Sequence, residues 1–454
     1  MRLQAHVIAL ALLLLAAGST HAQDEQQQRY PFIRYSANHL SYDSTSPTLH
    51  KFFTRWRNMN QYRNGNINIV HIGGSHVQAG MMTQTIRQRL LAASDGLVGP
   101  RGMIFPYSAA ARCNNPPDYR IHCRERMILT RCVYREPEYP LGLCGIAVTA
   151  RDHHTEVQVI MNEPTVTFNT TRVVLLGHSE GGVVPRLRTD RTEIYPSYID
   201  NLTDRFFFNI DSSVDSFVVV LPCREGQQFT IGGICLDGPT AGLTYHSIGV
   251  NGAAVPDYLR CPNFVRDLRM LHPDVVIFGI GINDANTNNF DTAAFRRSYL
   301  QLVDSVRSVN PDCAFIFITN NDSFVKESRR RYSVNPNGLL ARDVFYRLAA
   351  ETGGAVWDQF DIMGGLKSMD KWFDYGLAQT DRVHFTRAGY TVVGNLFADA
   401  LLETLSRYAS RKAARPSRPI NTSSANRSAR STEKAAPTRA SRSYDAPATK
   451  PPLF

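Results

Sequence analysis

The sequence has few long apolar runs, and this shortage bounds the class of protein. The stretch from Val7 to Ala17 is apolar but too short to span a bilayer as a helix, and nothing later is long and apolar enough to do so. No cysteine follows that stretch closely, which argues against a lipoprotein anchor. With Arg2 before it and small residues up to Ala22, it predicts a signal peptide over residues 1–22. We therefore expect an exported protein, periplasmic or associated with the cell envelope.

The cysteines include no C-x-x-C pair, so their spacing does not resemble a zinc site. Exported proteins retain disulfides, so we expect disulfides concentrated between Cys113 and Cys235. Spacing alone does not give their connectivity. The eight cysteines are Cys113, Cys123, Cys132, Cys144, Cys223, Cys235, Cys261 and Cys313.

Acidic residues are scarce in the last stretch of the chain. From Arg411 onward, ten Lys/Arg face two acidic residues, so this stretch carries +8 of the formal +10. It has almost no apolar residues, and we expect residues 411–454 to be disordered. Its charge would allow weak contact with anionic wall polymers, and a plain solvated tail is the alternative. The rest is nearly neutral, and no nucleic-acid partner is expected.

Without the predicted signal peptide and tail, the chain is still longer than one hydrophobic core usually occupies. Its hydrophobic pattern divides it into two parts. Short alternating runs between turn signals predict a β-sandwich-like module over residues 96–239, with strands near 155–160, 166–168, 172–176, 206–210 and 216–220. Before and after it, strands alternate with helices, which predicts one α/β domain from residues 23–95 and 240–410 with a parallel sheet covered on both faces. Its strands are expected at 67–72, 243–250, 274–280, 313–319 and 355–360, and its helices at 49–62, from about 76 to 91, 256–271, 292–309, 339–352 and 386–408.

The first strand of that domain ends at Gly73-Gly74 and is followed by Ser75. Ser75 is thus predicted at the carboxyl end of a strand and the amino end of a helix, where open α/β sheets place their ligand crevices and helix N–H groups stabilise anions. A nucleophilic serine is useful at such a position. The structural alternative is that Ser75 only caps the helix.

Further polar stretches follow other strands of the same sheet. His384 could take the proton of Ser75, and Asp381 could orient the imidazole and stabilise its charged form. The N–H groups of Ser75 and Gly249 and the side-chain amide of Asn283 could form an oxyanion hole. Taken singly, these residues could instead be turn glycines, helix caps or a surface ion pair. Together they predict acyl-transfer chemistry at one sheet edge.

A second serine has to be weighed against Ser75. Gly177-His178-Ser179-Glu180-Gly181 matches the G-x-S-x-G pattern and follows a predicted strand. That pattern requires a helix after the serine, whereas Gly182-Val183-Val184-Pro185 is poor helix sequence. A turn in the inserted module is the preferred interpretation. The histidines His71, His122, His153 and His154 have no partner pattern and are expected to be structural or exposed.

The ordered blocks resemble those of the SGNH (GDSL-like) hydrolase superfamily. Gly73-Gly74-Ser75 resembles its nucleophile block, Gly249 its second-block glycine, Gly281-Ile282-Asn283-Asp284 its G-x-N-D block and Asp381–His384 its D-x-x-H block. The resemblance implies an α/β/α, flavodoxin-like SGNH-hydrolase domain. One departure is Gly74, where the family usually has aspartate, so the hydrogen bonding that stiffens the nucleophile turn is in doubt.

Within the superfamily, Gly-x-Ser-His, the long insertion and Ser-Ile-Gly-x-Asn-Gly-Ala resemble peptidoglycan O-acetylesterases, which carry a β-rich, carbohydrate-binding-like module at the same place. This implies a secreted serine esterase that removes O-acetyl groups from an acetylated cell-wall glycan by an acyl-enzyme route, with no cofactor or metal. The alternatives are an esterase on another acylated polysaccharide or on a lipid, and a non-catalytic glycan-binding protein that kept the fold.

Overall fold

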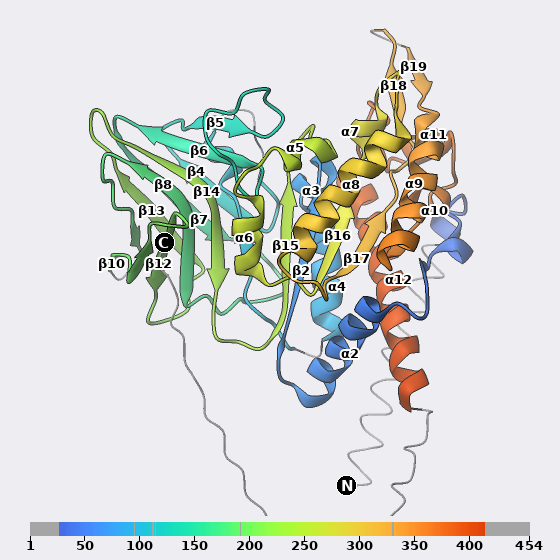
Figure 1. The fold of residues 1–454 in the computed structure, drawn as a ribbon, viewed down its shortest axis with the longest axis horizontal. Coiled ribbons are helices and arrows are strands. Elements are labelled where there is room, and N and C mark those ends of the chain that lie inside the picture. The colour runs from blue at the N-terminus through green and yellow to red at the C-terminus, as the bar shows by residue number, and fades with distance from the viewer. Residues whose placement is uncertain are drawn as a thin grey trace, which may run out of the picture. The chain divides into compact units, whose positions relative to one another are not determined.

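The computed structural model describes residues 27–413, except 95, 111–112, 114, 191 and 329–330. The predicted signal peptide lies outside the described residues. So does the predicted tail beyond Ala413, the residue at which the last helix ends. Figure 1 shows the α/β part, with its helices, on one side of the molecule and the strands of the inserted segment on the other.

The α/β part is built on a sheet whose strands are parallel apart from one edge strand, as the alternating pattern predicts. β1 is antiparallel to β20, and all other neighbours are parallel. The strand order is β1 (Leu40–Tyr42), β20 (Ala355–Trp357), β17 (Ala314–Ile318), β16 (Val275–Gly279), β2 (Asn66–Gly73) and β15 (Gly242–Gly249). The carboxyl ends of β2, β15 and β16 therefore meet at one edge, where Gly73 pairs with Gly249 and Gly279.

Alternate side chains of the strands pack on two layers of helices. Val70, Ile72 and Phe278 share one buried cluster with the helices α5 (Val255–Leu259), α6 (Phe264–Leu271), α8 (Thr292–Arg307) and α9 (Asn337–Thr352). Ile67, Ile69 and Ile277 share the other with α2 (Pro47–Tyr62), α4 (Met81–Ala93) and α12 (Arg387–Ala413). The remaining short helices are η1 (Tyr35–Ala37), α3 (Ser75–Gln78), η2 (Tyr107–Ala109), α7 (Ile282–Ala285), α10 (Gln359–Ile362) and α11 (Ser368–Asp374), and a hairpin pairs β18 (Phe324–Lys326) with β19 (Tyr332–Val334). The parallel sheet is thus covered on both faces.

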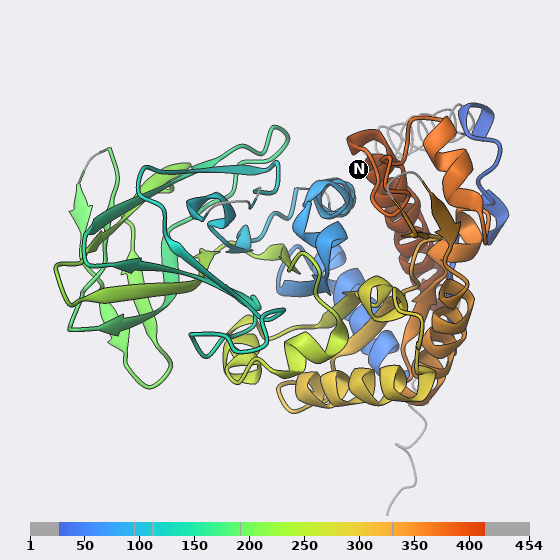
Figure 2. The ribbon, with the colours of Figure 1, turned by 90° about the horizontal axis from the view of Figure 1, so that it is seen from above.

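The inserted segment forms antiparallel sheets, which is consistent with a sandwich-like module between α4 and β15. One sheet has the order β10 (Glu193–Ile194), β9 (Arg186–Arg188), β13 (Ser216–Pro222), β7 (His154–Met161) and β4 (Tyr119–Cys123). The other has the order β11 (Tyr198–Asp200), β12 (Arg205–Asn209), β8 (Arg172–Glu180), β14 (Gln228–Asp237), β6 (Ile146–Arg151) and β5 (Ile128–Arg131), with β3 (Gly102–Ile104) paired to β14. Their buried residues belong to the same cluster as α5 and α8, and Figure 2 shows the module beside α3 and α4.

Several local predictions need correction. Residues 166–168 form no strand, and the helix predicted over 256–271 is two helices, α5 and α6. The helix expected from 76 to 91 breaks at Gly80, which has φ +75°. A Cβ there would lie 2.3 Å from Pro116 Cβ, so the inserted module crowds the chain at this glycine.

The predicted disulfides are absent from the structure. All eight cysteines lie among the described residues, and each is a free thiol. All but Cys123 are buried, where a thiol packs as a small apolar side chain. No helix among residues 27–413 combines the length and apolar character needed to cross a bilayer.

Candidate active site

Ser75 is the first residue of α3, and only Gly74 separates it from the end of β2. Gly73 has no room for a side chain, because a Cβ would lie 2.3 Å from Val77 Cγ2 and 2.7 Å from the Gly279 carbonyl. That carbonyl belongs to the neighbouring strand, so the turn is pressed against the sheet. The phenolic oxygen of the buried Tyr258 donates to the Gly73 carbonyl at 2.9 Å. The nucleophile turn is therefore held by contacts on both sides.

Ser75, His384 and Asp381 lie in line. Ser75 Oγ is 2.7 Å from His384 Nε2, and His384 Nδ1 is 2.7 Å from Asp381 Oδ2. The other carboxylate oxygen of Asp381 accepts the backbone N–H groups of Val383 and His384, each at 3.0 Å. These are the distances expected of a nucleophile, its base and the group that orients the base.

The carboxylate of Asp381 stays ionised. Partial burial works in the opposite direction, but the hydrogen bonds from the His384 ring and from the two backbone N–H groups lower the pKa of Asp381 to about 2. A charge is therefore present beside His384 at any ordinary pH. It favours the Nδ1-protonated tautomer and would stabilise an imidazolium if His384 accepted the Ser75 proton.

His76 packs behind the catalytic pair and was not predicted to take part. Its ring lies 5.2 Å from the His384 ring, centroid to centroid, and its Nδ1 is 3.0 Å from the Tyr390 hydroxyl. Burial, with the neighbouring His384, lowers the pKa of His76 to about 3, so this ring is neutral. A neutral ring can fix the position of His384 without repelling its charged form. The histidine after the serine in the sequence was the signal that could have found it.

Gly249 faces the first turn of α3. A Cβ on Gly249 would lie 2.3 Å from Gln78 N and 2.8 Å from the Gly74 carbonyl, so only glycine permits this approach. Its carbonyl accepts the hydroxyl of Tyr107 at 2.8 Å, from the inserted segment. Gln78 Oε1 in turn accepts the N–H of Asn251 at 2.6 Å. The second-block glycine is thus placed by close packing against the nucleophile helix.

Asn283, in α7, lies at the same hollow as Ser75 and His384. Its side-chain amide donates to the Ala253 carbonyl at 2.9 Å, which orients the group and leaves its second N–H for another acceptor. At Gly74, an added Cβ would lie 3.4 Å from Asn283 Nδ2, which is ordinary contact. Gly74, which stands where the resembling family usually has aspartate, therefore leaves room beside Asn283. The Gly74 carbonyl accepts the N–H of Gln78 at 3.0 Å.

We expect Asn283→Ala to lower kcat by roughly 10²–10³ with little change in KM. The negative charge appears only in the tetrahedral intermediate, so a donor aimed at it affects turnover more than substrate affinity. Initial rates on a small chromogenic acetate ester measure both constants. A variant that keeps the wild-type kcat would remove Asn283 from the oxyanion hole.

Asp284 lies next to Asn283 and titrates in an unusual range. Burial raises the pKa of Asp284 to about 7, although it accepts the N–H of Val255 at 3.1 Å and so caps α5. The unfolded carboxyl has the ordinary value of 3.8, so the folded state binds more protons between about pH 4 and pH 7. Its contribution to stability is therefore complete below about pH 4 and is lost as the pH rises through 7.

Asp284→Asn should remove that pH dependence. We expect the difference in unfolding free energy between variant and wild type to change by at most about 1.4 kcal/mol per pH unit between pH 4 and 7, in favour of the variant at the higher pH. Urea unfolding at several pH values measures it. Two curves that stay parallel over this range would contradict a raised pKa at Asp284.

The hollow around Ser75 has a volume of about 600 Å³, and the inserted segment forms part of its wall. Asn115 and Pro117 come from that segment, whereas Asn251 and Gly252 follow β15. Asn115 is fixed by Ser108, whose N–H it accepts at 3.1 Å and to whose Oγ it donates at 2.7 Å. The module therefore contributes to the candidate site as well as to the core.

Ser179 does not have the surroundings of a nucleophile. It lies on β8, its hydroxyl donates to the Val183 carbonyl at 2.8 Å, and a turn rather than a helix follows. The neighbouring His178 instead contacts Asp204, at 3.0 Å. Of the other histidines, His71 is buried against the Tyr245 hydroxyl, whereas His122, His153 and His154 are exposed.

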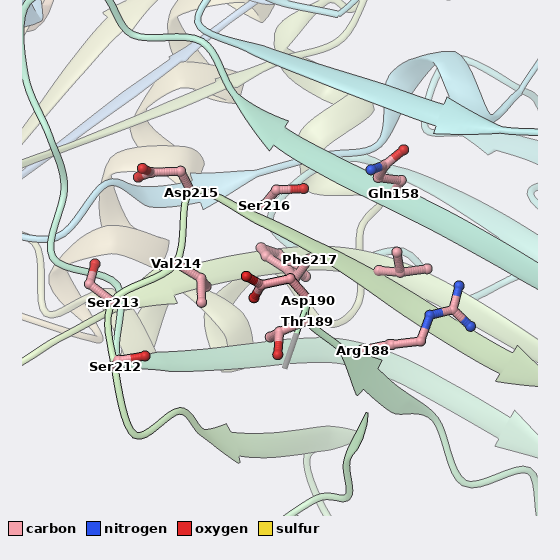
Figure 3. Close-up of a pocket in the computed structure, with 11 residues that line it drawn as sticks. Gln158, Arg188, Thr189, Asp190, Ser212, Ser213, Val214, Asp215, Ser216 and Phe217 are labelled. Carbon is pink, nitrogen blue, oxygen red and sulfur yellow. The ribbon is translucent and has the colours of Figure 1, made fainter. Parts of the chain in front are cut away.

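A separate hollow of about 490 Å³ lies on the inserted module, between β7, β9 and β13 (Figure 3). Polar side chains line it, including Gln158, Arg188 and Asp190, and the ring of Phe217 is buried rather than offered as a stacking surface. No histidine among the described residues lines this hollow. It therefore lacks the serine–base pair of the first site.

The chain is similar to known hydrolases in part of its sequence and in its fold. The model of the GDSL-like lipase/acylhydrolase family matches residues 236–392. No curated protein matches the sequence. A solved peptidoglycan O-acetylesterase is similar over 81% of this chain and 99% of its own, with 21% identity and a TM-score of 0.67, which shows a shared fold. A lipase/acylhydrolase from Enterococcus faecalis covers 37% of this chain and 77% of its own at 23% identity, with a TM-score of 0.28.

Proposed function

We propose that this chain, which matches the GDSL-like lipase/acylhydrolase family over residues 236–392 and shares its fold with a peptidoglycan O-acetylesterase, is an exported serine esterase that removes O-acetyl groups from a cell-wall glycan. The observation that carries the proposal is the aligned Ser75–His384–Asp381 set, with Asn283 at the same hollow and Gly249 packed against the first turn of α3. The fold shared with a peptidoglycan O-acetylesterase supports the substrate class. The predicted signal peptide supports a periplasmic or envelope location.

The geometry supports a two-step acyl transfer. Ser75 Oγ attacks the acetyl carbonyl carbon while His384 Nε2 takes the hydroxyl proton. The tetrahedral oxyanion is met by the N–H groups of Ser75 and Gly249 and the amide of Asn283. When it collapses, the C–O bond to the sugar breaks and His384 returns the proton to the leaving sugar oxygen. Water, deprotonated by His384, then attacks the acetyl carbon. The bond from that carbon to Ser75 Oγ breaks, His384 returns the proton to Ser75 Oγ, and acetate leaves.

Acetate release from O-acetylated peptidoglycan and from acetylxylan, together with turnover of a small chromogenic acetate ester, tests this function. We expect turnover of the small ester and preferential release from the cell-wall glycan. Release from acetylxylan alone would favour another acylated polysaccharide. Binding of glycan without turnover of any ester would identify a non-catalytic protein and overturn the esterase.

A further inference from the structure

The hollow at Ser75 continues into a second hollow on the inserted module. The second has a volume of about 710 Å³ and is lined by residues from β4, by Asn162 and by Pro164. Asn115, Pro117 and Arg387 line both hollows. One groove therefore leads from the catalytic serine to the first strand of the β4–β7 pair, far beyond the space that an acetyl group needs.

The permanent charges along this groove are positive. Arg387 stands where the two hollows join, and Arg120 on β4 lies at the module end. Both residues are exposed, and neither side chain forms an ion pair or hydrogen bond with any residue that the structure describes. No aspartate or glutamate of the described chain lines either hollow. The buried Glu163 nearby is already occupied by Arg87 and Gln88.

The position of Arg387 is unfavourable for the helix that carries it. It is the first residue of α12, and a cation at a helix N-terminus is repelled by the positive end of the helix dipole. Three residues earlier in the chain, His384 contacts the nucleophile. Arg387 thus offers five N–H donors to the groove beside the reacting group, without a carboxylate of its own to pair with.

We propose that this groove binds an acylated glycan that also bears carboxylates, with Arg387 pairing with a carboxylate close to the ester and Arg120 with one further along the chain. The inference rests on the proposed esterase function and deepens it by adding a charged substrate class. A guanidinium group binds a carboxylate through two parallel hydrogen bonds and so selects both charge and orientation. The carboxylate belongs either to a sugar or to a peptide attached to it.

The test compares kcat/KM for O-acetylated oligosaccharides that carry carboxylates with the same oligosaccharides after reduction of the carboxylates to alcohols. We expect wild type to prefer the anionic substrate and Arg387→Glu to lower the anionic-to-neutral ratio about 10–100-fold, as for loss of a hydrogen-bonded charge pair. The preference of wild type should also weaken as salt is added. Arg297→Glu, an exposed site on α8 with the same change in charge, should leave the ratio unchanged.

The outcomes separate this inference from the esterase function. A wild-type ratio near one, or an equal effect of Arg387→Glu and Arg297→Glu, would overturn the groove proposal while acetate release continued. No release from any substrate, the small ester included, would instead overturn the esterase itself. O-acetylated muramyl oligosaccharides identify the source when their peptide carboxylates are free, when these are amidated, and when the peptide is removed, which frees the lactyl carboxylate of the sugar. An Arg387 effect that disappears on amidation assigns the carboxylate to the peptide, and one that appears only after peptide removal assigns it to the sugar.

Discussion

Ser75→Ala is expected to lower kcat on a small acetate ester by about 10⁶-fold, to the residual level that the oxyanion donors and substrate binding provide. His384 and Asp381 have no proton to transfer once the hydroxyl is gone, so the three residues fail as a unit. We expect the variant to fold, because the Ser75 hydroxyl bonds to the His384 ring and takes no part in the backbone contacts that hold the turn. Single-turnover and steady-state rates measure the loss, and glycan binding should persist.

Ser179→Ala is the matched control. Ser179 likewise has a glycine and a histidine close to it in the sequence, Gly177 and His178, but its hydroxyl donates to the backbone of its own turn in the inserted module. We expect its turnover to stay near wild type. Activity that survives in Ser75→Ala and vanishes in Ser179→Ala would move the active site to the second serine.

Arg87→Met is expected to reduce the unfolding free energy by about 3–5 kcal/mol, the usual effect of breaking a buried ion pair. Arg87 Nη2 contacts Asp118 at 2.8 Å and Glu163 at 2.9 Å, and all three side chains are at most 2% exposed. Asp118 keeps Arg101 as a second partner, whereas Glu163 would keep only neutral donors. Burial opposes the charge of Glu163, yet Arg87 and the neighbouring donors hold its pKa below the ordinary value. The variant leaves that carboxylate buried and without a cation.

Arg89→Met, two residues away on the same helix, provides the control. Arg89 is 39% exposed in its side chain and pairs with the partly exposed Asp399, and such pairs contribute about 1 kcal/mol or less. Urea unfolding of both variants should separate them clearly. Equal losses would show that the buried network contributes no more than a surface pair.

The ion-pair network of Arg87, Asp118 and Glu163 also joins the α/β domain to the inserted module. Arg87 lies on α4, whereas Asp118 and Glu163 flank β4 and β7 of the inserted module. Arg87→Met should therefore loosen the wall of the groove, and a fall in activity on large substrates should accompany the loss of stability.

The sequence predicted the parallel sheet and the meeting of its polar strand ends, because each signal is local. The apolar run of Ile67–Ile72 and the glycines after it identify a buried strand and its turn, and the D-x-x-H spacing brings Asp381 to the ring of His384. Because strands and helices alternate along the chain, the strands form one parallel sheet and the sequence blocks that follow them meet at its carboxyl edge.

Other features depend on contacts between distant segments and left no local signal. Gly80 interrupts a helical pattern because Pro116 of the module lies against it. Arg87 has the pattern of a surface residue, and only the arrival of Asp118 and Glu163 makes it a buried one. The antiparallel edge strand β1 is three residues long, too short for a period to show. The expected export of the protein predicted disulfides, whereas the burial of seven of the eight cysteines as free thiols depends on the packing of several elements.

The separation of Ser75 and His384 along the chain has a consequence for biosynthesis. These residues are 309 positions apart, and between them the ribosome must make the inserted module and most of the sheet. At about 5–20 residues per second, roughly 15–60 seconds pass between synthesis of Ser75 and of His384. A growing chain therefore carries Ser75 without its hydrogen-bond partner until its last helix begins, and under the proposed mechanism a premature stop before His384 would yield a product without hydrolytic activity.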